Sequence, residues 1–320
     1  MNTLSNIKIF GHLKQFNFLV NSYKKRFPHA WILSGEKGIG KKTLIKKFIS
    51  CVLANDLFNT KIKIDISFTY DQLVSINKSF NTSVFEITNN HENKGDLNAV
   101  REIISKIKLT NFSSKHNSYV LIDNFDDLSK NCQNALLKTI EEPPENTLIF
   151  LIAHNIKGVT KTISSRCINL RLNSLNKEEF MNFLSNKNFD KLEENFEKLF
   201  TLSYGNPGFF EKIINLNGME IIKKIEEVIN EKQIDHLKIK EMSEKLTSDS
   251  EFFLRIVTSF FYNHTITILQ KNTNNIKLYK KIINFLQLLT IKNDVNLNIS
   301  INQILTSIFV NYFNLIKKEI

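Results

Sequence analysis

The segment most informative for chemistry is residues 35–43, GEKGIGKKT, in which three glycines are followed by two consecutive lysines and a threonine. An apolar run, residues 30–33, precedes it, and a helical pattern over residues 43–53 follows it. This strand–loop–helix order is typical of a phosphate-binding loop, because glycines let backbone N–H groups turn inward around phosphate oxygens while a lysine reaches the terminal phosphates. The residues predicted to surround a phosphate are Gly35, Gly38, Gly40 and Lys41.

Two positions depart from what a magnesium–nucleotide site needs. Lys42 stands where a Ser or Thr hydroxyl ligates Mg²⁺, and an ammonium cannot do so. Thr43 lies one residue further, about 100° round the helix, and is a poor substitute. Asp123 ends a predicted strand, where P-loop proteins hold their metal, but the next residue is Asn124, which cannot act as a general base. We therefore expect a degenerate nucleotide site that does not hydrolyse ATP. Weak binding of ATP or ADP at this loop is left open. For Asp123, the alternative to a metal-site role is that it only caps a turn.

The elements that must position these residues alternate between short apolar runs and helical patterns in the first half of the chain. This alternation predicts an α/β domain with a mostly parallel sheet that is covered on both faces. The predicted strands are residues 30–33, 83–87, 119–122 and 148–153, and the predicted helices are residues 43–53, 100–107 and 128–140.

From residue 174 onward the pattern is helical, with a turn predicted at residues 205–208. The helices are expected at residues 176–184, 191–202, 218–230, 251–270, 276–290 and 301–318. One of them carries an apolar stripe that we interpret as core or as a subunit contact, with part of it expected against other subunits. The stripe consists of Phe252, Phe253, Ile256, Val257, Phe260 and Phe261.

Composition limits the possible functions. The 320 residues carry 43 Lys and Arg against 32 Asp and Glu, a formal charge of +11, which suits either a nucleic-acid partner or a solvated surface without a partner. The three cysteines form neither a disulfide framework nor a zinc motif, so we expect no metal. The longest apolar run, residues 148–153, is too short to span a membrane, and the N-terminus does not have the order of a signal peptide. We expect a cytoplasmic location and no membrane partner.

Five motifs occur in an order that resembles one family. They are HAW at residues 29–31, GIGK at 38–41, LID at 121–123, NALLKTIEEPP at 134–144 and TISSRC at 162–167. Together they resemble the clamp-loader branch of the AAA+ proteins, and within it the delta-prime subunits of bacterial DNA polymerase III. The EEPP and Ser-Arg-Cys motifs are specific to that branch, whereas the phosphate-binding loop alone is not.

The resemblance implies a domain organisation and a set of partners. It implies an AAA+ P-loop domain over residues 1–172, a small helical lid domain over 173–213 and an all-α collar domain for oligomerisation over 214–320. The expected partners are gamma/tau and delta subunits in a hetero-oligomeric ring, and the sliding clamp and primer–template DNA through that complex. Some delta-prime subunits carry a zinc module after the P-loop helix, but only Cys51 lies in that region here.

The resemblance also implies roles for individual residues. Arg166, between Ser165 and Cys167, would enter the ATP site of a neighbouring subunit; the alternative is that it pairs with a local carboxylate. The segment 134–144 would face DNA or the neighbouring subunit, with Lys138 available to a phosphate. Two acidic residues complete this motif, Glu141 and Glu142.

Two sensor positions lack the residue that ATPases use. Ala153 stands at the end of the strand where a polar sensor is common, and the following His154 is expected to be a surface loop residue. Gly208 occupies the position at which hydrolysing relatives usually carry an arginine. We therefore expect a non-hydrolysing delta-prime scaffold that loads the clamp on primed DNA during replication. The alternatives are a gamma/tau-like ATPase motor and a general basic DNA-binding module.

Overall fold

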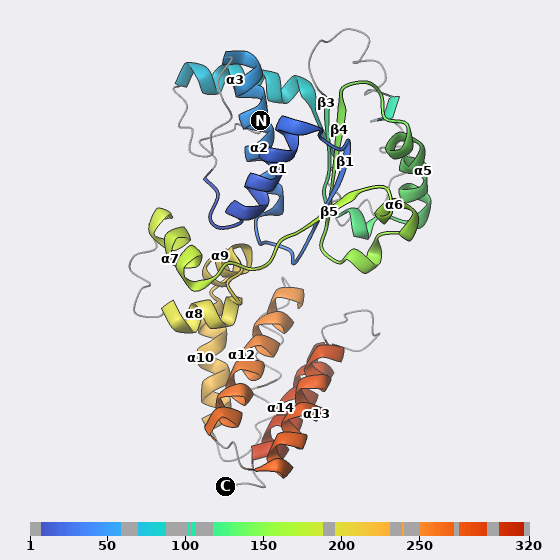
Figure 1. The fold of residues 1–320 in the computed structure, drawn as a ribbon. Helices are drawn as coiled ribbons and strands as arrows, with labels where there is room; N and C mark the ends of the chain where they lie inside the picture. Colours follow the sequence, from blue (N-terminus) through green and yellow to red (C-terminus); the bar gives the residue numbers. More distant parts are fainter. Residues whose placement is uncertain are drawn as a thin grey trace. The chain divides into compact units, whose positions relative to one another are not determined.

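A computed structural model of the chain describes residues 8–58, 70–87, 102, 104–105, 118–187, 196–230, 239, 250–271, 275–292 and 301–316 (Figure 1). The chain divides into two compact units, Met1–Lys187 and Asn188–Ile320. Each is described by itself below. The division into three domains at residues 172 and 213 stays a prediction.

The first unit is built on a five-stranded parallel sheet with the order β2-β3-β4-β1-β5. Every residue of β1, β3 and β4 is buried, as expected for parallel strands that are covered on both faces. The predicted α/β class is therefore confirmed. The strands are β1 (Ala30–Ser34), β2 (Val84–Ile87), β3 (Ser118–Ile122), β4 (Thr147–Ala153) and β5 (Ile168–Arg171).

Helices cover both faces of the sheet (Figure 1). Neighbouring residues along a strand belong to different core clusters, one on each face. Trp31, Leu121 and Phe150 join one core cluster, beneath α1 (Leu13–Lys25), α2 (Lys41–Phe58) and α3 (Tyr70–Ser83). Ile32 and Leu151 join the other, beneath α5 (Lys130–Glu141) and the one-turn α6 (Lys161–Ser164). Short 3₁₀ turns at Phe125–Asp127 and Ile156–Gly158 follow β3 and β4, and α7 (Lys177–Asn186) ends the described part of this unit.

The edge strand β5 and helices α1 and α3 are absent from the sequence prediction. β4 lies inside the sheet because it pairs with both β3 and β1, and β5 forms the edge beyond β1. Arg166 lies two residues before this edge strand. The strand was missed because only Leu170 of its four residues is buried, which leaves no apolar run to detect. The predicted helix 100–107 lies almost entirely outside the described residues.

The second unit is helical in every element described, as predicted. Asn206 caps the start of α9 by accepting a hydrogen bond from the Phe209 amide at 3.1 Å, and Pro207 begins the helix. Gly208 therefore lies in the first turn of a helix, which corrects the turn expected at residues 205–208. The helices are α8 (Phe196–Ser203), α9 (Pro207–Asn215), α10 (Gly218–Asn230), α12 (Ser250–Lys271), α13 (Ile276–Lys292) and α14 (Ile301–Ile316).

The phenylalanine-rich stripe of α12 is core. All six of its residues are at most 7% exposed. Phe252 packs edge-on against Phe209, and Phe261 contacts the rings of Phe309 and Tyr312 at 5.0 and 4.7 Å. The expectation that part of the stripe lies against other subunits is therefore wrong, because helices of the same unit bury it.

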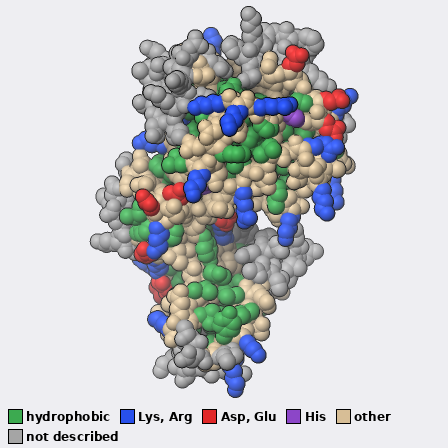
Figure 2. Space-filling model, viewed as in Figure 1, with side chains coloured by type: hydrophobic (Ala, Val, Ile, Leu, Met, Phe, Trp, Pro, Cys, Tyr) green, Lys and Arg blue, Asp and Glu red, His purple; other side chains and the backbone are tan. Residues whose placement is uncertain are grey.

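Charged side chains are spread over the face of the molecule that Figure 2 shows. On the face in Figure 2, Lys and Arg side chains occur in both units, with Asp and Glu among them. The basic charge on this face is therefore not gathered into one stripe. No helix within the described ranges is long and apolar enough to cross a membrane.

Candidate nucleotide-loop and arginine sites

The glycine loop connects β1 to α2, and its glycines meet two different needs. Gly35 has φ 145°, and a Cβ there would fall 2.4 Å from the Leu172 carbonyl oxygen, so any side chain would collide with the segment after β5. Gly40 has φ 97°, and a Cβ there would meet nothing within 4 Å. The backbone thus turns tightly at Gly35 and faces open space at Gly40, just before the amide end of α2.

Lys41 is held inside this loop. Its Nζ donates to the carbonyl oxygens of Gly35 and Glu36 at 2.6 and 2.7 Å, and the residue is 3% exposed. Burial lowers the pKa of Lys41 to about 8, although the carboxylates of Asp126 and Asp123 act in the opposite direction. A buried ammonium that is satisfied only by carbonyls still lacks a full counter-charge, and a phosphate would supply one.

Lys42 of α2 forms ion pairs with acidic residues in or directly after two strands of the sheet. Its Nζ forms an ion pair with Glu86 of β2, and lies 3.2 Å from Asp123 Oδ2 at the end of β3. Lys46, one turn further along α2, pairs with the other oxygen of Glu86 at 3.1 Å. Thr43 is exposed. The ammonium of Lys42 therefore engages the acid that a P-loop protein uses for its metal, and these residues do not fit Mg²⁺.

The loop after β3 contacts the loop after β4. Asn124 has φ 51°, and its Oδ1 accepts a 2.6 Å hydrogen bond from His154 Nε2. The Asp126 carboxylate accepts bonds from the backbone amides of His154 and Asn155 at 2.9 and 2.6 Å. Asn124 is thus engaged with its neighbour, in addition to being unable to take up a proton.

His154 lies in the loop after β4, as the sequence analysis expected, but it is half-buried and not fully at the surface. It lies beside Asn124, its Nδ1 is buried without a hydrogen-bond partner, and burial together with the charge of Lys41 lowers its pKa. A neutral imidazole at pH 7 follows. The sequence did hold a signal for this position, because His154 directly follows an apolar strand. The carboxyl ends of parallel strands meet at one edge of a sheet, so His154 could be expected near the residues that follow the other strands. Asp126 and Glu86 were also missed, since neither belongs to a motif.

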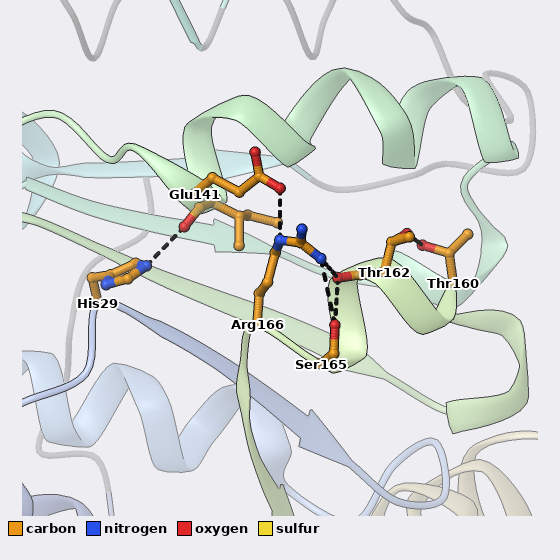
Figure 3. Close-up of polar contacts among 7 residues, drawn as sticks. His29, Glu141, Thr160, Thr162, Ser165 and Arg166 are labelled. Atoms are coloured by element: carbon orange, nitrogen blue, oxygen red, sulfur yellow. Dashed lines mark hydrogen bonds and ion pairs between the residues drawn. The ribbon is translucent and has the colours of Figure 1, made fainter.

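Residues of two motifs bind the Arg166 side chain (Figure 3). Its Nε lies 2.6 Å from Glu141 Oε1 at the end of α5, and its Nη1 donates to the Thr162 carbonyl oxygen at 2.8 Å. Ser165 Oγ donates to the same carbonyl at 3.0 Å. The Arg166 and Glu141 side chains are 42% and 45% exposed, so the guanidinium is ordered yet open to solvent. The alternative of a local carboxylate partner is therefore realised within this chain.

The remaining residues of the clamp-loader motif differ in environment. Lys138 is exposed on α5, and its carbonyl accepts the backbone N–H of the exposed Glu142 at 2.9 Å, which closes the helix before the two prolines. Cys167 is partly buried against the core, and burial raises the pKa of its thiol to about 11. The thiol thus stays protonated at neutral pH and belongs to the packing. Among the described residues, no group of three or more His, Cys, Asp or Glu could hold a metal ion.

The comparison with known families decides where the chain belongs. The family model described as "DNA polymerase III, delta subunit" matches residues 11–176, the segment that holds the glycine loop, Asp123 and Arg166. The chain belongs to this DNA polymerase III family. The clamp-loader resemblance of its motifs and its five-stranded parallel sheet agree with this membership.

Relatives within this polymerase III family carry more than one subunit name. The gamma subunit of Buchnera aphidicola subsp. Schizaphis graminum is 33% identical over 195 residues, 58% of this chain and 51% of that protein. The delta' subunit of the same organism is 28% identical over 193 residues, 55% of each. The gamma/tau subunit of Mycoplasma genitalium is 31% identical over 153 residues, 47% of this chain and 24% of that protein. The chain spans about half the length of the first two relatives, so its specific subunit role is argued separately.

Proposed function

We propose that this protein is a delta-prime-type subunit of the DNA polymerase III clamp loader, a non-hydrolysing AAA+ scaffold that helps load the sliding clamp on primed DNA in the cytoplasm. The observation that carries the proposal is the ion pairing of Lys42 with Asp123 and Glu86. A motor subunit needs a hydroxyl and a free carboxylate at these positions to hold its metal.

The base position supports the same conclusion. Asn124 is hydrogen-bonded to His154, and the pKa of that imidazole is lowered, so the imidazole is neutral at pH 7. The Nε2 of this neutral imidazole donates to Asn124, and its basic nitrogen, Nδ1, is buried away from solvent. Neither side chain is arranged to activate a water at this loop.

Arg166 is the residue through which we expect this subunit to act on a neighbouring subunit. Its guanidinium is half-exposed and always charged. Arg166 precedes the amino end of β5, whereas the glycine loop follows the carboxyl end of the neighbouring parallel strand β1, so the two lie at opposite ends of this strand pair. We propose that it enters the ATP site of a neighbouring motor subunit and stabilises the transferring phosphoryl group there. The expected partners are gamma/tau and delta subunits in a ring, with the clamp and the primer–template DNA bound through the complex.

A gamma/tau-like ATPase motor is the second candidate. It is favoured by the higher identity to a gamma subunit, 33% against 28% for delta'. A motor would need another residue to ligate Mg²⁺, because Lys42 stands at the position of the usual ligand and pairs with Asp123. A general DNA-binding module has only the formal charge of +11 in its support, and the basic side chains in Figure 2 are dispersed.

The decisive experiment measures phosphate release by the full chain, alone and with its co-expressed gamma/tau and delta subunits. We expect no turnover by the isolated chain and DNA-stimulated turnover by the assembled complex. Turnover by the isolated chain that disappears in Lys41→Ala would instead establish the motor. Steep salt-dependent DNA binding by the isolated chain, without complex formation, would establish the DNA-binding module.

A further inference from the structure

Four charged side chains form one electrically balanced cluster beside the glycine loop. Lys42 bridges Glu86 and Asp123, and Lys46 holds the second oxygen of Glu86. The cluster thus contains two ammonium groups and two carboxylates. The side chains of Lys46 and Glu86 are each 16% exposed, and Lys42 and Asp123 are 31% and 21% exposed, so water screens these pairs only in part.

The carboxylates in this cluster are fixed in place. Glu86 lies on β2, in register with Leu121 of β3, and therefore faces α2. Asp123 is held by its backbone N–H to the Ile87 carbonyl at 3.0 Å, and its Oδ1 accepts the Asn124 amide at 3.0 Å. Lys42 needs no rearrangement of either strand to meet both acids.

We propose that the Lys42 ammonium takes the place of the divalent cation at this loop, so that the loop binds the phosphates of a nucleotide without Mg²⁺. In an ordinary P-loop the metal shields the acid after the strand from the phosphates. Here the ammonium of Lys42, which is covalently attached to the chain, neutralises the charges of Asp123 and Glu86. This inference rests on the proposed absence of hydrolysis at this loop, but not on the role of Arg166.

The charges around the loop explain why a metal would be excluded and a phosphate accepted. A divalent cation that approached Asp123 would meet the ammonium of Lys42, and Glu86 is occupied by both Lys42 and Lys46. A phosphate would meet the buried ammonium of Lys41, the amide end of the 18-residue helix α2 and the open space at Gly40. The carboxylates of Glu86 and Asp123, which would otherwise repel it, are already paired with lysines.

The test is calorimetric titration of the full chain with ADP and with ATP, once with MgCl₂ and once with EDTA. We expect the affinities under the two conditions to agree within about twofold. Lys42→Thr restores the usual hydroxyl and frees Asp123, so Mg²⁺ should now tighten binding by at least about tenfold. Lys46→Thr is the matched control, because it removes a lysine from the same helix but leaves the contact between Lys42 and Asp123. Lys41→Ala should abolish binding in both conditions.

Each alternative result overturns the inference. Wild-type affinity that rises about tenfold with Mg²⁺, no binding in either buffer, or binding that survives Lys41→Ala would each do so. If Lys42→Thr does not fold, Lys42→Thr with Glu86→Gln removes one charge of each sign and gives the same comparison. Phosphate release, measured separately, tests the proposed function. Metal-dependent binding without turnover would overturn this inference and leave the scaffold proposal standing.

Discussion

The Arg166 guanidinium and the Glu141 carboxylate form an ion pair, with Nε and Oε1 separated by 2.6 Å. The pair joins the EEPP motif at the end of α5 to the Ser-Arg-Cys motif before β5. Both side chains are nearly half exposed, and such pairs contribute only about 0–1 kcal/mol to stability. The pair therefore orients Arg166 more than it stabilises the fold.

Arg166→Ala should leave folding and ring assembly intact while lowering the DNA-stimulated ATPase activity and clamp loading of the assembled complex. Arginine fingers contribute on the order of 10³–10⁵ in rate at one site, and the total loss is smaller when other sites of the ring keep their own fingers. Arg166→Lys should rescue poorly, because an ammonium cannot make a two-pronged contact. Arg171→Ala, an exposed arginine of β5, is the control. Unchanged activity in a fully assembled Arg166→Ala complex would remove the trans-acting role.

Glu141→Gln tests whether the ion pair positions the arginine. We expect a smaller loss of complex ATPase activity than in Arg166→Ala, and no further loss when the two changes are combined, because Glu141 would act only through Arg166. Glu142→Gln is the matched control, since Glu142 is the exposed neighbour of Glu141 and its hydrogen bond to the Lys138 carbonyl is made by the backbone N–H. Additive losses in the double variant would show that Glu141 has a separate role.

Sequence reasoning reached the strands with apolar runs and the glycine loop, because buried parallel strands and phosphate loops have local signatures. It did not reach β5, whose side chains are mostly exposed. It identified Lys42 as a departure from the usual P-loop hydroxyl and Asp123 as a candidate metal-site acid. Their contact could not be predicted, because it depends on the sheet order that sets β3 near α2. The place of His154 after an apolar strand puts it at the carboxyl edge of the sheet, but its contact with Asn124 also requires β3 and β4 to be neighbours, which no local pattern predicts.

Phe261→Ala should destabilise the helical second unit. Phe261 has no exposed surface and contacts the rings of Phe285, Phe309 and Tyr312 from α13 and α14. Truncation of a buried phenylalanine costs about 3–5 kcal/mol, which thermal unfolding monitored by circular dichroism would detect. Tyr262→Ala, the next residue and 39% exposed, should cost far less. Equal losses in the two variants would contradict the placement of α12 in the core.

Glu86→Gln should make the protein less stable at neutral pH but not in acid. Burial by itself would raise the pKa of Glu86, but the ion pairs with Lys42 and Lys46 outweigh it and hold that pKa below its usual value. A carboxyl whose pKa is lower in the folded state stabilises the protein at pH values above its unfolded pKa, and this contribution is lost as the pH falls through the folded pKa. Loss of its charge-assisted hydrogen bonds should cost about 1–3 kcal/mol at pH 7. Urea unfolding of the wild type and of Glu86→Gln should therefore give free energies of unfolding that differ at pH 7, begin to converge at about pH 4, near the unperturbed pKa of a glutamate, and meet only below the lowered folded pKa of Glu86. A difference that stays constant down to pH 3 would show that Glu86 acts through packing and not through its charge.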